Sequence, residues 1–306
     1  PLFAWKTRSA SASIPSPFNF PVALTGGPVG AALVAGNTVV MKPASDTCWS
    51  PSLLADCMRQ AGIPNGVFNF VTGPGSTLGE ALINHPDVAG ITFTGSYEVG
   101  MNIYCNFGHS RYVRPTILEL GGKNPVLVSR HADVEDAALG SVRSAFGLQG
   151  QKCSACSRVY IEEPLYEAVL ERMVALTQKL AVGDPTERQT YMGPVINKKS
   201  YADYQRFMED LSAAGKVLTG GKTLTEGALS KGYFCAPTIV ADVPLTHPLW
   251  KQEMFVPIVM VSPVKDLEQG IALANDVQYG LTAGFYGSLS EVDWFFDHIE
   301  AGVVYT

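Results

Sequence analysis

The chain has 306 residues, of which 46% are hydrophobic and 16% are charged, and its net charge is −6. This length allows a large core and favours two domains, while the low charged fraction suggests much buried or subunit-facing surface. The net negative charge, and the absence of a cluster of basic residues in the sequence, argue against nucleic acid or an anionic membrane as a partner. Six cysteines without framework spacing favour a reducing, cytoplasmic compartment.

Two stretches near the start of the chain differ from ordinary helix or strand patterns. Residues 6–13 are small and polar without strand alternation, so we expect an irregular N-terminus there. Residues 22–41 form the one candidate membrane segment, but glycines and Pro28 interrupt it. We therefore predict a helix that ends near Gly36 and a strand after it.

Short β-branched segments then alternate with helical patterns up to the consecutive Gly121 and Gly122. This alternation predicts parallel strands with crossover helices, a doubly wound α/β fold. The two glycines interrupt the pattern, and we place a boundary there between domains of residues 1–121 and 122–306. In the first domain we expect strands over residues 38–41, 67–71, 90–93 and 116–120, and helices over residues 51–60, 77–84 and 99–107.

The second domain continues the same α/β pattern. Residues 302–306 resemble the middle of a strand, so we expect the chain to be truncated. The predicted strands cover residues 126–128, 158–161, 257–261 and 282–286, and the predicted helices cover residues 134–146, 165–180, 200–214 and 291–300.

Three segments of the first domain have residues suited to a phosphate-bearing ligand. Residues 71–79 join a strand to a helix and contain Gly75 and Gly79, which would let the backbone approach a pyrophosphate. Ser96 follows a strand and could cap a helix, bind phosphate, or do both. Lys42 follows another strand at its carboxyl end, where doubly wound sheets bind ligands. Loop glycines without a ligand and a solvated lysine are the alternatives.

Cys153 is the candidate nucleophile, because Gly150 lets backbone N–H groups approach it and Lys152 can stabilise its thiolate. Upstream, Glu119 is a candidate carboxylate base. Packing is the commoner role of a cysteine. Cys153 and Cys156 also form a C-x-x-C, but no second pair and no histidine spacing completes a zinc site, so no metal is expected. A thioredoxin-like pair fits a short βαβ domain better than this position.

Six motifs together resemble the aldehyde dehydrogenase superfamily, from about residue 14 to the last residue. The Ser-Pro-Phe-Asn-Phe and Gly-Gln-Lys-Cys-Ser-Ala-Cys-Ser-Arg forms are most similar to the L-glutamate γ-semialdehyde (pyrroline-5-carboxylate) dehydrogenase branch. In chain order, the motifs are Ser16-Pro-Phe-Asn-Phe-Pro21, Lys42-Pro-Ala-Ser45, Phe93-Thr-Gly-Ser96, Glu119-Leu-Gly-Gly-Lys-Asn-Pro125, Gly150-Gln-Lys-Cys153 and Glu253-Met-Phe-Val-Pro257.

The resemblance implies two Rossmann-type domains, a partial NAD(P)-binding domain and a catalytic thiol domain. It also implies that Cys153 attacks an aldehyde and that hydride transfer to NAD or NADP leaves a thioester. The Asn19 amide and the Cys153 N–H would stabilise the oxyanion, at ~3 kcal/mol per donor. Glu119 would activate the water that releases the acid.

The resemblance further implies that Ser154 contacts a substrate carboxylate, that Glu253 holds the nicotinamide ribose and that Phe255 packs on the nicotinamide. Two residues depart from the pattern. Ser45 stands where many relatives have glutamate, so NADP could be used as well as NAD. Val256 replaces a glycine and would disturb the nicotinamide loop. The other implied cofactor contacts are Phe18, Lys42, Gly75, Gly79, Gly95 and Ser96.

Relatives have further segments at both ends that complete the cofactor domain, anchor the substrate and form an oligomerisation arm. We therefore expect a homo-oligomer for the full-length form, and no nucleic acid or membrane partner. Three alternatives remain: an acyl-CoA-forming enzyme, which Glu119 disfavours, an inactive nucleotide-binding fragment, and a cofactor-independent esterase that uses Cys153 and Asn19.

Overall fold

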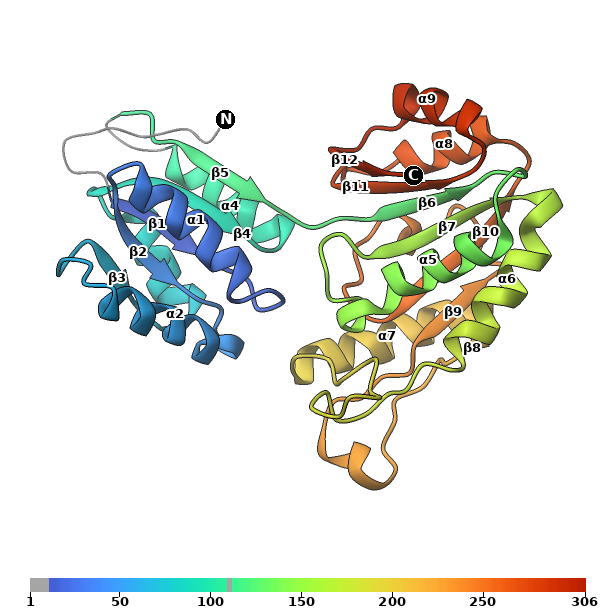
Figure 1. The fold of residues 1–306 in the computed structure, drawn as a ribbon, viewed down its shortest axis with the longest axis horizontal. Coiled ribbons are helices and arrows are strands. Elements are labelled where there is room, and N and C mark those ends of the chain that lie inside the picture. The colour runs from blue at the N-terminus through green and yellow to red at the C-terminus, as the bar shows by residue number, and fades with distance from the viewer. Residues whose placement is uncertain (1–10, 109–111) are drawn as a thin grey trace. The chain divides into compact units, whose positions relative to one another are not determined.

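The computed structural model describes residues 11–108 and 112–306, and the chain divides into two compact units, Pro1–Leu120 and Gly121–Thr306 (Figure 1). Each unit has its own sheet with helices packed against it. We describe each unit by itself and call them the first and second units.

The first unit contains a five-stranded sheet of order β3-β2-β1-β4-β5, in which all neighbours are parallel. The chain builds β2 and β3 on one side of β1 and then β4 and β5 on the other, which is the doubly wound arrangement that was predicted. The strands are β1 (Ser11–Pro15), β2 (Thr38–Lys42), β3 (Phe68–Phe70), β4 (Val88–Thr94) and β5 (Thr116–Glu119). The helices are α1 (Ala23–Val34), α2 (Trp49–Gln60), α3 (Glu80–Asn84) and α4 (Tyr97–Phe107), with short turns at Ser45–Thr47 and Gly75–Gly79.

The prediction of an irregular chain over residues 6–13 is wrong for residues 11–13, which belong to the central strand β1. Ala12, Ser13 and Ile14 are buried, and β1 pairs with β2 on one side and β4 on the other. Small side chains fit this crowded position between two strands, so sheet pairing overrides a weak local preference. Residues 6–10 of that prediction lie outside the described residues.

The apolar stretch of residues 22–41 forms α1 and then β2, as predicted. Gly36 adopts a φ of 83° and lets the chain leave the helix and turn into the strand. Within residues 11–108 and 112–306, no helix combines the length and the apolar character needed to cross a membrane.

The second unit contains a seven-stranded sheet of order β12-β11-β6-β7-β10-β9-β8, in which only the β8–β9 pair is antiparallel. The strands are β6 (Asn124–Val128), β7 (Cys156–Glu162), β8 (Lys216–Thr219), β9 (Thr238–Ala241), β10 (Ile258–Val264), β11 (Thr282–Tyr286) and β12 (Val303–Tyr305). The helices are α5 (Val134–Phe146), α6 (Glu163–Thr177), α7 (Lys198–Ala214), α8 (Leu267–Asn275) and α9 (Leu289–His298), with short helical turns at Gly147–Gly150, Gly227–Lys231 and Pro248–Trp250.

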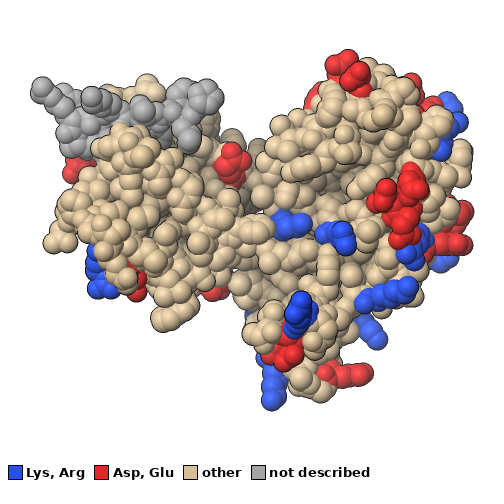
Figure 2. Space-filling model, viewed as in Figure 1, with Lys and Arg blue, Asp and Glu red and all other residues tan. Residues whose placement is uncertain are grey.

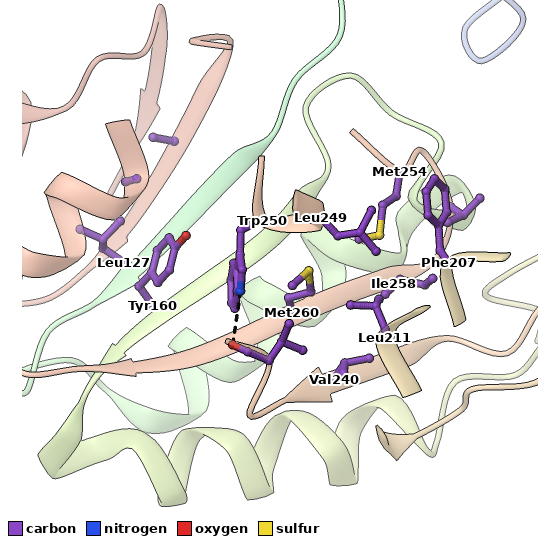
Figure 3. Close-up of a cluster of buried hydrophobic side chains, with 14 of the residues drawn as sticks. Leu127, Tyr160, Phe207, Leu211, Val240, Leu249, Trp250, Met254, Ile258 and Met260 are labelled. Atoms are coloured by element: carbon purple, nitrogen blue, oxygen red, sulfur yellow. Dashed lines mark hydrogen bonds between the residues drawn. The ribbon is translucent and has the colours of Figure 1, made fainter. Parts of the chain in front are cut away.

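Alternate side chains of the central strands pack into two large clusters on opposite faces of this sheet. Helices α5 and α6 cover one face, and α7, α8 and α9 cover the other. In the cluster covered by α7, α8 and α9, the rings of Tyr160 and Trp250 stack with centroids 5.4 Å apart (Figure 3). The Trp250 indole N–H donates to the Val243 and Pro244 carbonyls at 3.4 and 3.1 Å, so this buried donor is satisfied.

Three elements of the second unit were not predicted: β8, β9 and α8. The two strands have four residues each, too few for a clear alternating pattern. Helix α8 does have a local signal, because the Asp266 carboxylate caps it by accepting from the Gln269 N–H at 2.9 Å.

Candidate active site

Cys153 lies in the turn between α5 and β7, on a backbone with unusual geometry. Leu148, Gln149 and Gly150 adopt consecutive positive φ values of 53°, 59° and 66°. A Cβ on Gly150 would lie 2.6 Å from the Val256 carbonyl oxygen. This position therefore requires glycine both for its φ and for its close approach to a neighbouring backbone.

The buried Gln151 side chain attaches this turn to the segment that leads into α7. Its Oε1 accepts from the Ile196 N–H at 3.0 Å, and its Nε2 donates to the Ser200 hydroxyl at 3.3 Å. Sequence analysis assigned no role to Gln151. Its partners lie 45 and 49 residues further along the chain, so only the folded structure brings them together.

Asn124, at the start of β6, holds the thiol turn from the other side. Its Nδ2 donates to the Cys153 carbonyl at 2.7 Å and to the Ala155 carbonyl at 2.9 Å. Its Oδ1 accepts from the Thr282 N–H at 3.1 Å. Gly122 adds a close contact, because a Cβ there would lie 2.5 Å from the Cys153 carbonyl oxygen. The turn is thus tied to strands β6 and β11.

The two cysteines of the C-x-x-C differ in environment. Cys153 is half-buried, and Ser154 next to it is also half-buried. Cys156 is fully buried, donates to the Arg158 carbonyl at 3.5 Å, and burial raises its pKa to about 12. Burial lowers the pKa of Lys152, although the nearby Cys156 and Cys153 thiols oppose this shift. Cys156 is therefore a packing residue, and Cys153 is the more accessible thiol of the pair.

Glu253 and Phe255 lie on the loop before β10. The Gly122 N–H donates to Glu253 Oε1 at 2.8 Å, and a Cβ on Gly121 would collide with the same carboxylate. Phe255 takes a φ of 55°. Val256 is buried in the core of the second unit, and the expected disturbance of the nicotinamide loop stays a prediction.

Beneath this loop, Lys123 is buried, and its Nζ has no hydrogen-bond partner among the residues that the structure describes. Burial and the nearby Arg158 lower the pKa of Lys123 to about 7, while Glu253 opposes the shift. The Arg158 guanidinium is also buried and donates to three backbone carbonyls, those of Lys123, Leu273 and Ala274. Arg158 thereby connects the start of β6 with the end of α8.

A cavity of about 420 Å³ lies beside the thiol turn, between β6, β11 and α5. Arg143 and Lys152 contribute positive charge, and Ser144 and Ser154 contribute hydroxyl groups. Among the described side chains that line it, none is acidic, and the final residues Tyr305 and Thr306 also form part of its wall. The cavity therefore offers positively charged and hydroxyl side chains to a small molecule.

In the first unit, the predicted residues cluster at one edge of the sheet. Phe18 and Asn19 follow β1, Lys42 ends β2, and Ser96 follows β4, while Glu119 ends β5. Since all five strands are parallel, their carboxyl ends share an edge, and ligands of doubly wound sheets bind there. The change of winding direction at β1 places the switch point between β1 and β4.

Lys42 is not the solvated lysine that the sequence allowed as an alternative. It is 7% exposed, and its Nζ donates to the Pro43 carbonyl at 3.0 Å. Burial lowers its pKa, with a smaller opposing effect from Cys48. The nearby Ser45 hydroxyl donates to the Gly73 carbonyl at 3.5 Å. Ser45 thus lies against the segment that precedes the glycine-rich turn.

The glycine-rich turn is open. Apart from the chain neighbours and the turn's own backbone, no described residue has an atom within 4 Å of a Cβ built on Gly75 or Gly79, in the turn that leads into α3. Gly95 differs, because a Cβ there would collide with the Phe93 ring. Ser96 caps α4 as predicted, accepting from the Val99 N–H at 3.4 Å. On the face shown in Figure 2, charged side chains are sparse over the first unit.

Comparisons with known proteins agree with this architecture. The family model described as "Aldehyde dehydrogenase family" matches residues 11–306. The chain is 43% identical over 271 residues to 1-pyrroline-5-carboxylate dehydrogenase of Geobacillus thermodenitrificans, covering 87% of this chain and 52% of the relative. It thus spans about half the length of the curated relatives it matches.

Solved structures show the same similarity. A 1-pyrroline-5-carboxylate dehydrogenase from Thermus with bound NAD matches 97% of this chain and 58% of its own, with 37% identity and a TM-score of 0.92. An NADP-dependent enzyme of E. coli matches 96% of this chain and 60% of its own, with 36% identity and a TM-score of 0.91. Since the family model covers nearly all of it, the chain belongs to the aldehyde dehydrogenase family.

Proposed function

We propose that this chain provides the nucleotide-binding and thiol portions of an NAD(P)-dependent aldehyde dehydrogenase, which oxidises an aldehyde to a carboxylic acid. The observation that supports this most is the thiol turn. It presents a half-buried Cys153 beside Lys152, while Asn124, Gln151 and Gly150 hold its backbone. A pre-positioned nucleophile is what covalent catalysis requires.

In the proposed reaction, the Cys153 thiolate adds to the aldehyde carbon and forms a thiohemiacetal. The Asn19 amide and the Cys153 N–H donate to the resulting oxyanion. A bound NAD(P)+ would supply the acceptor for the hydride of this carbon, and the Cys153 sulfur would then carry the acyl group as a thioester. Glu119 then removes a proton from water, which attacks the thioester and releases the carboxylic acid and the free thiol.

The first unit fits such a cofactor. Its switch point lies between β1 and β4, and Gly75 and Gly79 leave open space where a pyrophosphate could approach the backbone. We assign Phe18, Lys42, Ser45, Gly95 and Ser96 to the same site, and Glu253 and Phe255 to the nicotinamide end.

We propose L-glutamate γ-semialdehyde as the substrate. The 43% identical relative is named for pyrroline-5-carboxylate oxidation. The cavity beside Cys153 offers Arg143, Lys152 and Ser154 to a carboxylate on the substrate. An aliphatic aldehyde of similar length without that carboxylate is the matched comparison, and it should have a higher KM.

For the cofactor, Ser45 places no carboxylate beside the adenosine ribose, so we propose that both NAD and NADP are accepted. One similar structure contains NAD and another is described as NADP dependent. Measuring KM for both cofactors tests this, and an NADP value far above that for NAD would reject it.

The experiment measures the absorbance of the reduced cofactor that forms when the chain is mixed with each cofactor and each aldehyde. The variants Cys153→Ala and Glu119→Gln are measured in the same way. Cys57→Ala, which removes an exposed thiol, is the matched control. We expect the wild-type chain and Cys57→Ala to turn over. Cys153→Ala should lose turnover, and Glu119→Gln should stop at the thioester. Cofactor binding without turnover would support the second candidate, a nucleotide-binding fragment. The cytoplasmic location and homo-oligomeric assembly stay predictions.

A further inference from the structure

We propose that Asn124 is a positioning residue for the nucleophile. Its side-chain amide sets the Cys153–Ser154 and Ala155–Cys156 peptide planes, and with them the direction of the Cys153 thiol. The inference rests on the proposed function, in which Cys153 attacks the substrate. Asn124 belongs to β6 and contacts the backbone of Cys153, which lies in the turn before β7.

Both N–H groups and the oxygen of this amide have backbone partners. Asn124 is 3% exposed, its two N–H groups meet the Cys153 and Ala155 carbonyls, and its oxygen meets the Thr282 N–H. These partners also define its orientation, because exchanging nitrogen and oxygen would place the NH2 group against an N–H donor. β6 lies between β7 and β11 in the sheet, so one side chain ties the thiol turn to two strands.

Peptide geometry carries this restraint to the reacting groups. A peptide is planar and trans, so a Cys153 carbonyl that points at Asn124 directs the Ser154 N–H the opposite way. The same bond restricts rotation between the Cys153 Cα and its carbonyl carbon, next to the thiol-bearing side chain. Gly122 packs closely against the same carbonyl, because a Cβ there would lie 2.5 Å from its oxygen.

The chemical nature of the amide is essential to this role. An aspartate has almost the same shape and keeps the acceptor for Thr282, but it would present oxygen to the two carbonyls that now receive N–H groups. Repulsion would turn the Cys153–Ala155 segment away from β6. An alanine would remove all three bonds without adding repulsion. A serine would keep one donor, so the proposal predicts that thiol positioning worsens in the order Asn, Ser, Ala, Asp.

The test measures the rate constant for alkylation of Cys153 by iodoacetamide over a pH series, with the labelled peptide identified by mass spectrometry. It uses the 306-residue chain and the variants Asn124→Ser, Asn124→Ala and Asn124→Asp. Because misplacement of a reacting group by about 1 Å can cost on the order of 100-fold, we expect Asn124→Asp to react at least ~10-fold more slowly across the pH range. Asn124→Ser should lie between it and the wild type.

Asn37→Ala is the matched control, since Asn37 is also a buried amide and donates to the Ala32 carbonyl at 3.1 Å in the first unit. It should lower Tm but leave the alkylation rate within about twofold, because its bonds do not reach the thiol turn. An equal slowing in Asn37→Ala would overturn the proposal, as would wild-type rates in folded Asn124 variants. If Asn124→Asp does not fold, Asn124→Ser decides, and a wild-type rate there also overturns it.

The same experiment separates this proposal from the one on which it rests. If Cys153 of the wild-type chain resists alkylation while other exposed thiols react, the nucleophile itself is misassigned, and both proposals fail. If Cys153 reacts but is insensitive to residue 124, only the role of Asn124 fails.

Discussion

Two glycines of the first unit and two of the second serve opposite purposes. In the described part of the first unit, no residue beyond the adjacent backbone has an atom within 4 Å of the place where a Cβ on Gly75 or Gly79 would be. In the second unit, Cβ atoms on Gly122 and Gly150 would lie 2.5 and 2.6 Å from backbone carbonyl oxygens. The first pair leaves space that a ligand can occupy, whereas the second pair lets backbone segments pack against each other.

This difference shows how each unit supports its proposed role. A cofactor that binds and leaves needs an accessible backbone, and the glycine-rich turn of the first unit provides it. A covalent nucleophile needs a fixed direction, and the second unit holds its thiol turn from several elements at once. The hydrophobic clusters fit this difference in rigidity, because those of the second unit are far larger than the two small clusters of the first.

The largest effect is expected for Gly150→Ala. Its φ of 66° and the close Val256 and Ala145 carbonyls leave no place for a methyl group. We expect a loss of about 4 kcal/mol in the free energy of unfolding, from backbone strain together with overpacking. Urea denaturation measures it. A loss below about 1 kcal/mol would show that the thiol turn is not held as rigidly as described.

The second effect concerns pH and the carboxyl ends of β6 and β11. The Glu291 carboxylate accepts hydrogen bonds from Ser129, His131 and Ser288. Burial alone would raise its pKa, but the bonds from Ser288, His131 and Ser129 lower it from 4.5 to about 2. A lowered pKa in the folded state stabilises the fold above the unfolded pKa, and this stability is lost as pH falls through the folded pKa.

The stability of the wild-type chain should therefore decrease between pH 4.5 and about 2 by about 3 kcal/mol more than that of Glu291→Gln. Thermal or urea unfolding over this pH range measures the difference. Parallel curves for the two proteins would contradict this account of the Glu291 network.

Helix caps give a smaller, paired comparison between the units. Asp133 accepts from the Asp136 N–H at 3.0 Å in the second unit, while Ser96 accepts at 3.4 Å in the first. We expect Asp133→Ala to cost about 1 kcal/mol and Ser96→Ala about half of that. Urea titrations of both variants check this, and a larger cost for Ser96→Ala would reverse the ranking.

The smallest effect on stability is expected for Gly75→Ala. The open space around Gly75 predicts a change within about 0.5 kcal/mol, whereas cofactor affinity should fall roughly 10-fold because a methyl group then occupies the proposed approach path. Calorimetric titration with NAD, alongside Gly27→Ala as an open control in α1, measures both quantities. An unchanged affinity for NAD would contradict the placement of the pyrophosphate beside Gly75.

Local patterns predicted much of this fold. The bounds of α5 and β11 match the predicted ranges, and the amphipathic pattern of α5 makes its helical period clear. Cys153 could be singled out because its neighbours carry the chemical signal. By contrast, β1 was missed because its burial comes from two neighbouring strands, and Asn124 and Gln151 were missed because their partners lie far along the chain.

The central claim is that Cys153 is the nucleophile, and acylation by p-nitrophenyl acetate tests it without the need for a cofactor. The chain is mixed with the ester, quenched in acid, digested and examined by mass spectrometry for the acetylated residue, alongside Cys153→Ala. We predict an acetyl thioester on Cys153 of the wild-type chain and its loss in Cys153→Ala. Acetylation that persists in Cys153→Ala at the wild-type rate, or that occurs at another residue instead, would contradict the account.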